Sequence, residues 1–374
     1  MRSICFLGLD NYPLLNADYA AGYIGGESVQ QTLLARAFVA AGYDVSMIVK
    51  DCGQSDEEVI DGIRVLKAFR PGHGIRGLRY VHPRTTQSLR ALWKANADVY
   101  YQSCAGMLTG LTAAFCRLAG KRFVFRVASD ADCIPGQHLV DTWYDRKIYE
   151  FGLRNNSLVA AQTDKQRNLL IKHYGIVANV INMVVEPPAE RPPLTKDIDV
   201  LWVNNFRPLK RPELVAKLAI ALPTARLAVI GGPCPGAERY YDQVADTLRS
   251  LPNVDVCGAV PYREVNNYFS RAKLFINTSE VEGFPNSFLQ AWIRGLPVVS
   301  FFDPDSLIER ENLGTVPETV DEMARTIKDL LGFPERLASK AACARAYAEQ
   351  HFTPDAAVHR YIEAVQAGAH RSRT

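Results

Sequence analysis

The sequence predicts an α/β protein made of two doubly wound domains. Short apolar runs alternate with longer amphipathic stretches, which is the pattern of parallel strands connected by helices. This alternation stops at VEPPAERPPLTKD, which has four prolines in thirteen residues, and then resumes. Because 374 residues exceed what one compact core usually holds, we expect a domain on each side of that segment.

The first domain is expected to span residues 1–185. Each of its expected strands is a short apolar run, and each expected helix has apolar residues every three or four positions. The strands are expected at residues 3–9, 44–49, 63–67, 98–101, 122–127, 158–161 and 180–184, and the helices at 26–41, 85–95, 107–119, 141–154 and 164–174.

Residues 186–197 are expected to form a stiff linker, because proline disfavours both helix interiors and central strands. The second domain is expected to span residues 198–352, with strands at 198–204, 226–231, 254–257, 274–277 and 297–301 and helices between them. Ligands of such sheets bind outside the carboxyl ends of the strands. We therefore expect loops of both domains to face a central cleft.

Composition excludes several classes of protein. The formal net charge of +3 is too small to indicate nucleic-acid binding, and no apolar run reaches the length of a membrane span. The eight cysteines are scattered, with no pair at metal-ligand spacing. We expect a reduced, cytoplasmic chain without a metal site.

Gly25 and Gly26 precede a predicted helix. Glycines there allow a ligand to approach the backbone, and free N–H groups at a helix start attract phosphate. The spacing is not that of a dinucleotide fingerprint, so a plain helix start with a flexible entry remains an alternative.

Arg207 and Lys210 follow the first strand of the second domain. A planar guanidinium and a compact ammonium together suit the two phosphates of a pyrophosphate. The alternative is a solvated basic loop. Their position directly after a strand favours the ligand-binding interpretation.

The stretch EGFPNSFLQ, which starts at Glu282, crosses from a loop into a predicted helix. Pro285 suits the first helical turn, and the N–H groups of Asn286, Ser287 and Phe288 are then expected to point toward an anion. Gln290 is about one turn inside the helix. This stretch therefore predicts a ligand-binding helix start with a carboxylate on one side and an amide on the other.

These motifs resemble the retaining, nucleotide-sugar-dependent glycosyltransferases of the GT-B architecture, in particular family four (group 1). That family has a Glu, seven intervening residues and a second Glu, written around E-G-F-P-x-x-x-L-E-A and followed by G-x-P-V-V; this chain has EGFPNSFLQAW and then GLPVV. The resemblance extends to Gly25-Gly26, to Arg207 and Lys210, to the IGG turn, and to a last helix at residues 353–374 that would cross back to the first domain. It implies two Rossmann-like domains.

The resemblance also implies roles for residues. Glu282 would lie by the donor sugar, Arg207 and Lys210 would neutralise the leaving diphosphate, and Gln290 would face the ribose. The backbone near Val260 would flank the base, and no metal or other cofactor is required. The implied donor-binding residues are Gly25, Gly26, Arg207, Lys210, Val260, Glu282, Gly283, Phe284, Pro285, Asn286, Ser287 and Gln290.

The chain departs from the family at two places. The second Glu is replaced by Gln290, which has one acceptor oxygen where a carboxylate has two. In the loop after residue 126, where many relatives have a His, this chain has Asp130 and Asp132. We expect Asp130 to contact sugar hydroxyls or orient the acceptor. Capping of a following helix or turn by either Asp is an equal alternative.

Residues 62–97 contain eight Lys or Arg residues and no acid. Interleaved apolar groups fit a patch that faces anionic lipid or a diphosphate-bearing acceptor, whereas an ordinary solvated face is the alternative. The cations are Arg64, Lys67, Arg70, Arg76, Arg79, Arg84, Arg90 and Lys94.

The sequence thus predicts a retaining glycosyltransferase, cytoplasmic or peripheral on the membrane. It would transfer a sugar from a nucleoside-diphosphate sugar, UDP before GDP, to a glycan, a lipid-linked or a small-molecule acceptor. The alternatives are a nucleotide-sugar epimerase and a non-catalytic partner subunit that binds nucleotide-sugar or glycan.

Overall fold

The computed structural model describes residues 1–16, 18–19, 25–75, 78, 80–138, 140, 142–188, 195–280 and 282–371. Contacts between residues divide the chain into two compact units. Unit 1 comprises Met1–Val184 together with Pro354–Thr374, and unit 2 comprises Val185–Thr353. Half of the expected linker, residues 189–194, lies outside the described residues.

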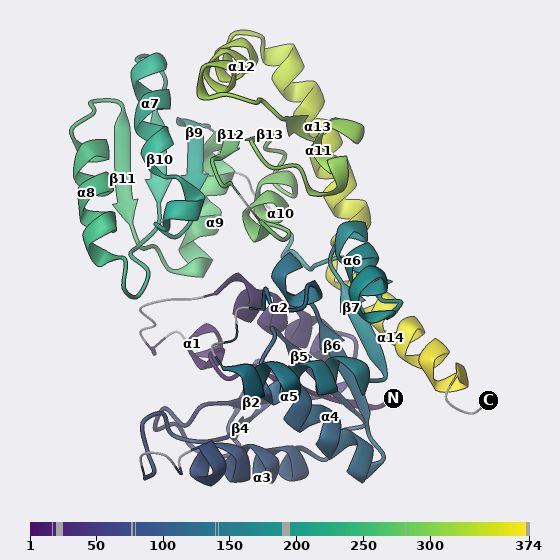
Figure 1. Ribbon diagram of the computed structural model, residues 1–374. Coiled ribbons are helices and arrows are strands. Elements are labelled where there is room, and N and C mark those ends of the chain that lie inside the picture. The colour runs from purple at the N-terminus through teal and green to yellow at the C-terminus, as the bar shows by residue number, and fades with distance from the viewer. Residues whose placement is uncertain are drawn as a thin grey trace. The chain divides into compact units, whose positions relative to one another are not determined.

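Unit 1 is built on an eight-stranded sheet in the order β3-β4-β2-β1-β5-β6-β7-β8 (Figure 1). The pairings are parallel except for β3, which is antiparallel to β4. The strands are β1 (Ser3–Leu7), β2 (Asp44–Val49), β3 (Val59–Ile60), β4 (Ile63–Lys67), β5 (Val99–Ser103), β6 (Arg122–Arg126), β7 (Leu158–Ala161) and β8 (Asn179–Val180). The helices are α1 (Tyr12–Leu15), α2 (Gly26–Ala40), α3 (Thr86–Ala95), α4 (Met107–Ala119), α5 (Trp143–Arg154), α6 (Asp164–Tyr174) and α14 (Pro354–Arg371).

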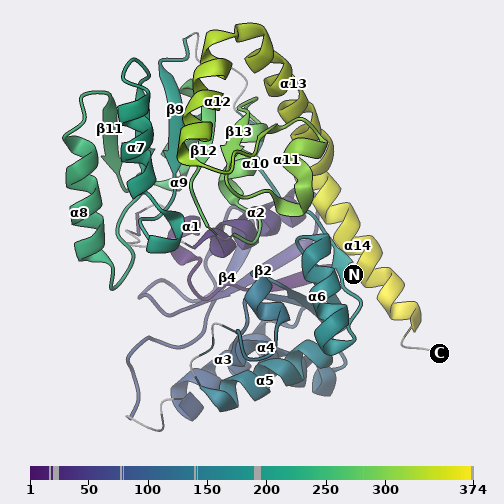
Figure 2. The same ribbon diagram turned by 45° about the horizontal axis from the view of Figure 1, so that its top comes forward.

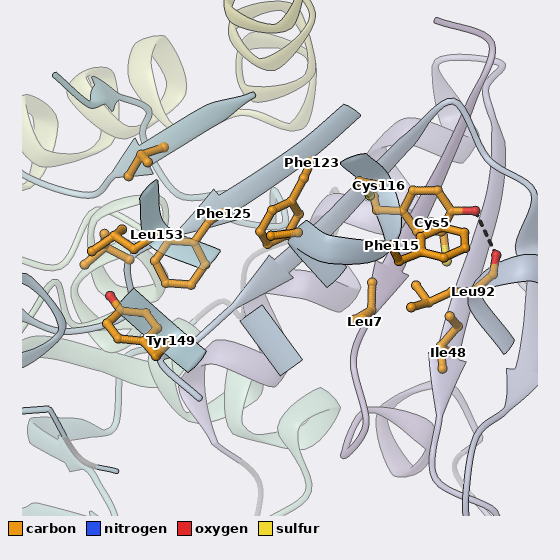
Figure 3. Close-up of a cluster of buried hydrophobic side chains, with 14 of the residues drawn as sticks. Cys5, Leu7, Ile48, Leu92, Phe115, Cys116, Phe123, Phe125, Tyr149 and Leu153 are labelled. Carbon is orange, nitrogen blue, oxygen red and sulfur yellow. Dashed lines mark hydrogen bonds between the residues drawn. The ribbon is translucent and has the colours of Figure 1, made fainter. Parts of the chain in front are cut away.

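Side chains that alternate along the strands fill two cores, one on each face of this sheet. Cys5 and Leu7 of β1 belong to the cluster under α3, α4 and α5, in which Phe125 of β6 packs on Tyr149 of α5 with ring centroids 5.6 Å apart (Figure 3). Phe6, between them in β1, contacts Phe38 of α2 on the other face. The sheet is therefore a middle layer between helices, as Figure 2 shows.

Unit 2 has a six-stranded, entirely parallel sheet in the order β11-β10-β9-β12-β13-β14. The strands are β9 (Ile198–Val203), β10 (Leu227–Ile230), β11 (Val254–Gly258), β12 (Ala272–Asn277), β13 (Val298–Ser300) and β14 (Gly314–Thr315). The helices are α7 (Glu213–Ala221), α8 (Glu238–Arg249), α9 (Tyr262–Arg271), α10 (Asn286–Trp292), α11 (Leu307–Arg310), α12 (Val320–Gly332) and α13 (Pro334–His351).

The core of unit 2 is also divided by its sheet. Trp202 of β9 and Ile276 of β12 belong to the cluster under α7, α8 and α12. Phe275, the neighbour of Ile276 in β12, contacts Phe269 of α9 and Phe288 of α10. The expected fold class, α/β with two parallel sheets covered by helices, is confirmed.

No helix among the described residues is long and apolar enough to cross a membrane. The eight cysteines are free thiols.

Candidate functional site

The strongest cluster of polar side chains in unit 2 lies where β9 and β12 end. These strands are hydrogen-bonded neighbours, so the loops that follow them meet at the carboxyl edge of the sheet. There Lys210 forms an ion pair with Glu282, and the Ser279 hydroxyl donates to the same Glu282 oxygen at 2.6 Å. Because only 13% of the Lys210 side chain and 11% of the Glu282 side chain are exposed, water screens this pair weakly.

Thr278 anchors the loop that presents Lys210. Its hydroxyl donates to the Lys210 carbonyl at 2.7 Å and accepts from the Trp202 indole at 3.0 Å. Arg211 donates to the Thr278 carbonyl at 2.8 Å, which ties the same loop a second time. The backbone that carries Lys210 is therefore fixed to the loop after β12.

Arg207, the other predicted cation, is exposed and forms no ion pair with any residue that the structure describes. Burial raises the pKa of the Cys234 thiol, and the charges of Arg207 and Lys210 oppose that increase, so both cations lie near Cys234. Lys210 is matched by a carboxylate whereas Arg207 is not. An anion at this edge would thus meet the charge of Arg207 first.

Glycines follow β10 at the same edge. A Cβ on Gly231 would come within 1.8 Å of the Asn204 carbonyl oxygen, and one on Gly232 within 2.9 Å of the Ala259 Cβ. The end of β10 can therefore lie this close to its neighbours because residues 231 and 232 are glycines. Val260 is half-buried two residues beyond β11.

The stretch that begins at Glu282 differs in detail from its prediction. Pro285 is the N-cap residue of α10, with Asn286 as the first helical residue. The N–H of Phe288 donates to the Pro285 carbonyl at 3.1 Å and so does not point to a ligand, which corrects that expectation. The ring of Phe284 packs against Trp292 and Phe352, with centroids 6.2 and 5.8 Å away.

Gln290 is buried, with 6% of its surface exposed. Its Nε2 donates to Oδ1 of Asn266 in α9 at 3.1 Å. One donor of the amide is thus used inside the protein, and the orientation that this bond fixes turns Oε1 away from Asn266.

In unit 1, Gly25 is the N-cap of α2 and Gly26 its first residue. A Cβ on Gly25 would meet no atom of the described residues within 4 Å. The segment between β1 and α2 is described only in part, since residues 17 and 20–24 lie outside the described residues.

The two aspartates after β6 have different partners. The Asp130 carboxylate forms an ion pair with Lys165 at 2.7 Å. The Asp132 carboxylate accepts from the N–H groups of Ala128 and Ser129 at 3.0 and 3.1 Å and completes a capping box. Asp132 therefore caps a 3-10 turn, the alternative that the sequence left open.

Sequence reasoning missed three residues of the site in unit 2: Ser279, Thr278 and Asn266. Ser279 and Thr278 lie in the NTSE segment just before Glu282, a short polar run after an apolar strand that could have been noticed. Asn266 lies on another helix, and no local signal pairs it with Gln290.

Comparisons with known proteins agree with this arrangement. A family model described as "Glycosyl transferases group 1" matches residues 198–332, and one described as "Glycosyl transferase 4-like domain" matches residues 25–189. The chain belongs to the group 1, family 4-like glycosyltransferases.

Two curated relatives share part of the chain. A D-inositol 3-phosphate glycosyltransferase of Kineococcus radiotolerans is 29% identical over 170 residues, 38% of this chain and 39% of that protein. One of the same name from Mycolicibacterium paratuberculosis is 28% identical over 160 residues, 38% of this chain and 36% of that protein. The match thus spans well under half the length of these relatives.

Two solved structures share the fold over nearly the whole chain. Anabaena HepE in complex with UDP and glucose has a TM-score of 0.74 at 16% identity, covering 98% of this chain and 100% of that one. Sucrose-phosphate synthase from Thermosynechococcus elongatus has a TM-score of 0.72 at 17% identity, covering 100% and 99%. The fold is that of GT-B glycosyltransferases.

Proposed function

We propose that this chain transfers a glycosyl group from a UDP-sugar to a hydroxyl group of an acceptor, with retention of the anomeric configuration. The observation that carries the proposal is the Lys210–Glu282–Ser279 cluster beside the exposed Arg207. A cation paired with a carboxylate lies there beside a second cation that has no ion pair among the described residues. Both are at the carboxyl edge of a parallel sheet, where ligands of such sheets bind.

For this transfer the protein mainly has to position charged side chains next to the leaving group. The bond between the anomeric carbon and the diphosphate oxygen breaks, and a bond from that carbon to the acceptor oxygen forms on the same face. The acceptor's proton passes to the departing diphosphate. Arg207 and Lys210 stabilise the negative charge that develops on the diphosphate, so the residues present account for leaving-group stabilisation without a metal.

Glu282 has two tasks in this proposal. One carboxylate oxygen holds the Lys210 ammonium and the Ser279 hydroxyl. The other accepts a hydrogen bond from a hydroxyl of the donor sugar. UDP is favoured as the nucleotide because the similar HepE structures contain UDP or UDP-glucose.

The same comparisons support a class of acceptor, because the curated relatives are named D-inositol 3-phosphate glycosyltransferases and one HepE complex contains glucose. We infer a polyol, either a sugar or an inositol phosphate. Gly25 and Gly26 at the start of α2 allow such a ligand to approach the backbone of unit 1.

A kinetic comparison tests the proposal. UDP-glucose and other UDP-sugars are offered with glucose or D-inositol 3-phosphate, and UDP release and the anomeric configuration of the product are measured. Lys210→Met and Glu282→Ala are each expected to lower kcat/KM about 10²–10³-fold, because each removes a charge placed at the reacting groups.

Lys273→Met is the matched control. Lys273 pairs with Asp199 at 2.7 Å between the same two strands, but at their opposite ends. It should leave turnover unchanged. An inverted product would contradict retention, and turnover unaffected by Glu282→Ala would show that the assigned site is wrong.

A non-catalytic protein that binds nucleotide-sugar is the second candidate, favoured by the bonding of Gln290 to Asn266. UDP binding by calorimetry without any UDP release from the sugar panel would support it. Conversion of the UDP-sugar to its epimer without an acceptor would instead support the epimerase alternative.

We also propose that part of residues 62–97 contacts an anionic lipid surface. Acids from outside the stretch neutralise two of its cations: Lys67 pairs with Asp51 at 3.1 Å, and Lys94 with Asp56 at 2.7 Å. Arg64 is also used internally, donating to the carbonyls of Lys94 and Ala95. Arg76 and Arg79 lie outside the described residues.

The exposed part of residues 62–97 is amphipathic. Ile75, Leu78, Val81 and Trp93 are 60 to 72% exposed, an unusual density of exposed large apolar groups. In the same stretch, the guanidinium of Arg84 lies 5.6 Å from the Tyr80 ring centroid. Apolar anchors beside cations fit the interface of an anionic bilayer.

Flotation with vesicles of phosphatidylglycerol and phosphatidylcholine tests this surface. The double variant Ile75→Ser, Val81→Ser is expected to reduce the bound fraction several-fold. Val177→Ser, at a residue 70% exposed elsewhere on unit 1, should not. Equal flotation of all three proteins, or flotation of none, would remove the membrane proposal.

A further inference from the structure

Unit 2 has a cavity on its edge strand, outside the Lys210–Glu282 cluster. The cavity volume is about 630 Å³, within the range of about 300–1,000 Å³ that is typical of small-molecule sites. Its lining residues belong to β14 and the loop before it, to α12 and to the first turns of α13. Helices α12 and α13 contact each other and lie side by side in Figures 1 and 2.

The cavity is separate from the proposed donor site. Asn312 and Lys340 are bonded to each other at the amino end of β14, in a sheet whose strands are all parallel. Lys210 and Glu282 follow the carboxyl ends of β9 and β12, and β13 lies between β12 and β14. A ligand at the amino end of the edge strand would therefore not occupy the donor site.

Lys340 is a half-buried cation of this cavity that has no carboxylate partner. Its ammonium donates to Asn312 Oδ1 and to the Gly314 carbonyl, each at 2.7 Å, and both acceptors are neutral. Because an ammonium has three N–H groups, one of them is left without an acceptor in the described part of the chain. Burial lowers the pKa of Lys340, so its positive charge is incompletely compensated.

Arg325 is a second lining cation without a counter-charge. It is exposed on α12 and forms no hydrogen bond or ion pair with any residue that the structure describes. By contrast Arg336, which also lines the cavity, pairs with Asp329 at 2.7 Å. Lys340 and Arg325 are thus the cations that an anion in the cavity would meet.

Hydroxyl groups line the same cavity. Those of Thr315, Thr326 and Ser339 make no hydrogen bond with the residues described. Hydroxyl groups, like ammonium and guanidinium groups, donate to phosphate oxygens. Cations and hydroxyl donors together therefore favour a phosphate group as the anion.

The acids that line the cavity indicate what else the ligand carries. One oxygen of Glu322 accepts from the Glu318 N–H at 2.9 Å, and one oxygen of Asp329 accepts from Arg336 at 2.7 Å. The second oxygen of each carboxylate accepts no hydrogen bond within the described residues and can accept one from a hydroxyl group. A polyphosphate would instead bring further negative charge toward these carboxylates, which is unfavourable.

We propose that this cavity binds a small phosphate monoester that carries hydroxyl groups. The phosphate lies at Lys340 and Arg325, and the ligand hydroxyls donate to Asp329 and Glu322. This inference concerns a second site on unit 2 and does not rest on the proposed glycosyl transfer.

Isothermal titration with glycerol 3-phosphate tests the proposal, with inorganic phosphate and glycerol as the two parts of the probe. The titrations are done at constant ionic strength and with saturating UDP, which occupies the cations of the proposed donor site. We expect saturable binding of glycerol 3-phosphate to one site per chain, weaker binding of inorganic phosphate, and none of glycerol.

Arg325→Gln is the main variant, because Arg325 has no partner among the described residues and its loss should leave the fold intact. It is expected to weaken binding of glycerol 3-phosphate about tenfold, since one charge-assisted hydrogen bond is lost. Lys328→Gln is the matched control: Lys328 is an exposed cation of the same helix that does not line the cavity, and its variant should bind like the wild type.

Arg207→Gln shows whether the probe instead binds at the donor site, and it should leave the affinity for glycerol 3-phosphate unchanged. Lys340→Gln is expected to weaken binding as Arg325→Gln does. Its thermal unfolding is measured beside it, because Lys340 also bonds to Asn312 and Gly314.

Three results would overturn the inference. They are no saturable binding of glycerol 3-phosphate to the wild type, an unchanged affinity in Arg325→Gln, and an equal loss in Arg325→Gln and Lys328→Gln, which would indicate a general effect of charge. Loss of binding in Arg207→Gln alone would place the probe at the donor site and would also contradict it. Because no turnover is measured, these failures leave the proposed function intact, and failure of UDP-sugar transfer leaves this inference intact.

Discussion

Two residues eight positions apart on the α10 segment, Glu282 and Gln290, have opposite surroundings. Glu282 holds a cation and a hydroxyl, so its charge is compensated inside the protein. Gln290 gives one amide N–H to Asn266. Its amide has one acceptor oxygen where the family's second carboxylate has two. We therefore expect the Gln at position 290 to affect the affinity for the donor and not the reaction at Glu282.

Restoring the carboxylate at position 290 tests this expectation. Gln290→Glu is expected to bind UDP about fivefold more tightly, the equivalent of about 1 kcal/mol for one more hydrogen bond. The new charge can be tolerated because Asn266 can turn its N–H₂ toward it and because Arg294 donates to the backbone carbonyl of the same residue at 3.2 Å. Calorimetry with UDP measures the change.

Gln290→Ala is the comparison for this variant and should bind UDP more weakly than the wild type. If Gln290→Glu also binds more weakly, the amide is adapted to this ligand and position 290 does not face a ribose as proposed.

At the scale of elements, the sequence predicted the strands and helices that build both sheets, because their signals are local. The strands 44–49, 63–67 and 158–161 and the helices 107–119 and 164–174 coincide with β2, β4, β7, α4 and α6. Short elements such as β3 and β14 were missed, since two residues carry no period. The sequence correctly placed Lys210 in the loop after β9, because the end of an apolar strand can be recognised in the sequence.

What the sequence did not reveal depends on contacts between distant segments. The pairing of Lys94 with Asp56, and the pairing of Gln290 with Asn266, join residues 38 and 24 positions apart. No composition or spacing argument predicts such neighbours, so the sequence overestimated the number of free cations in the basic stretch.

The turn after β10 offers a test at this scale. Gly231 has φ +156° and would place a Cβ 1.8 Å from the Asn204 carbonyl oxygen. Gly231→Ala is expected to destabilise unit 2 by at least about 2 kcal/mol and to weaken UDP binding, because the strand end must move away from the loop of Lys210. Urea unfolding and calorimetry measure the two effects.

Gly332→Ala is its control in the same unit, since a Cβ there meets nothing within 4 Å at the end of α12. That variant should be neutral or stabilising by up to about 1 kcal/mol. Equal stability of the two variants would mean that the close approach at Gly231 relaxes without cost.

At the scale of the whole molecule, the chain leaves unit 1 at Val184 and returns to it at Pro354. Helix α14 then completes the unit, packing Tyr361 against Tyr101 with ring centroids 5.8 Å apart. The Tyr361 hydroxyl accepts from the buried Arg126. Unit 1 is therefore assembled from two segments that lie far apart in the sequence, and its stability depends on both.

Two substitutions of Tyr361 distinguish the contribution of its packing from that of its hydrogen bond with Arg126. Tyr361→Phe leaves the Arg126 Nη1 without its acceptor and is expected to cost about 1–3 kcal/mol, whereas Tyr361→Ala also leaves a cavity and should cost about 3–5 kcal/mol. His359→Ala, at an exposed position of the same helix, should cost less than about 0.5 kcal/mol. Hydrogen exchange should show faster exchange of the β5 and β6 amides in unit 1, and unchanged exchange in β9 and β12 of unit 2. Uniform acceleration in both units would mean that the chain unfolds as one cooperative body, and that α14 stabilises more than the unit that it completes.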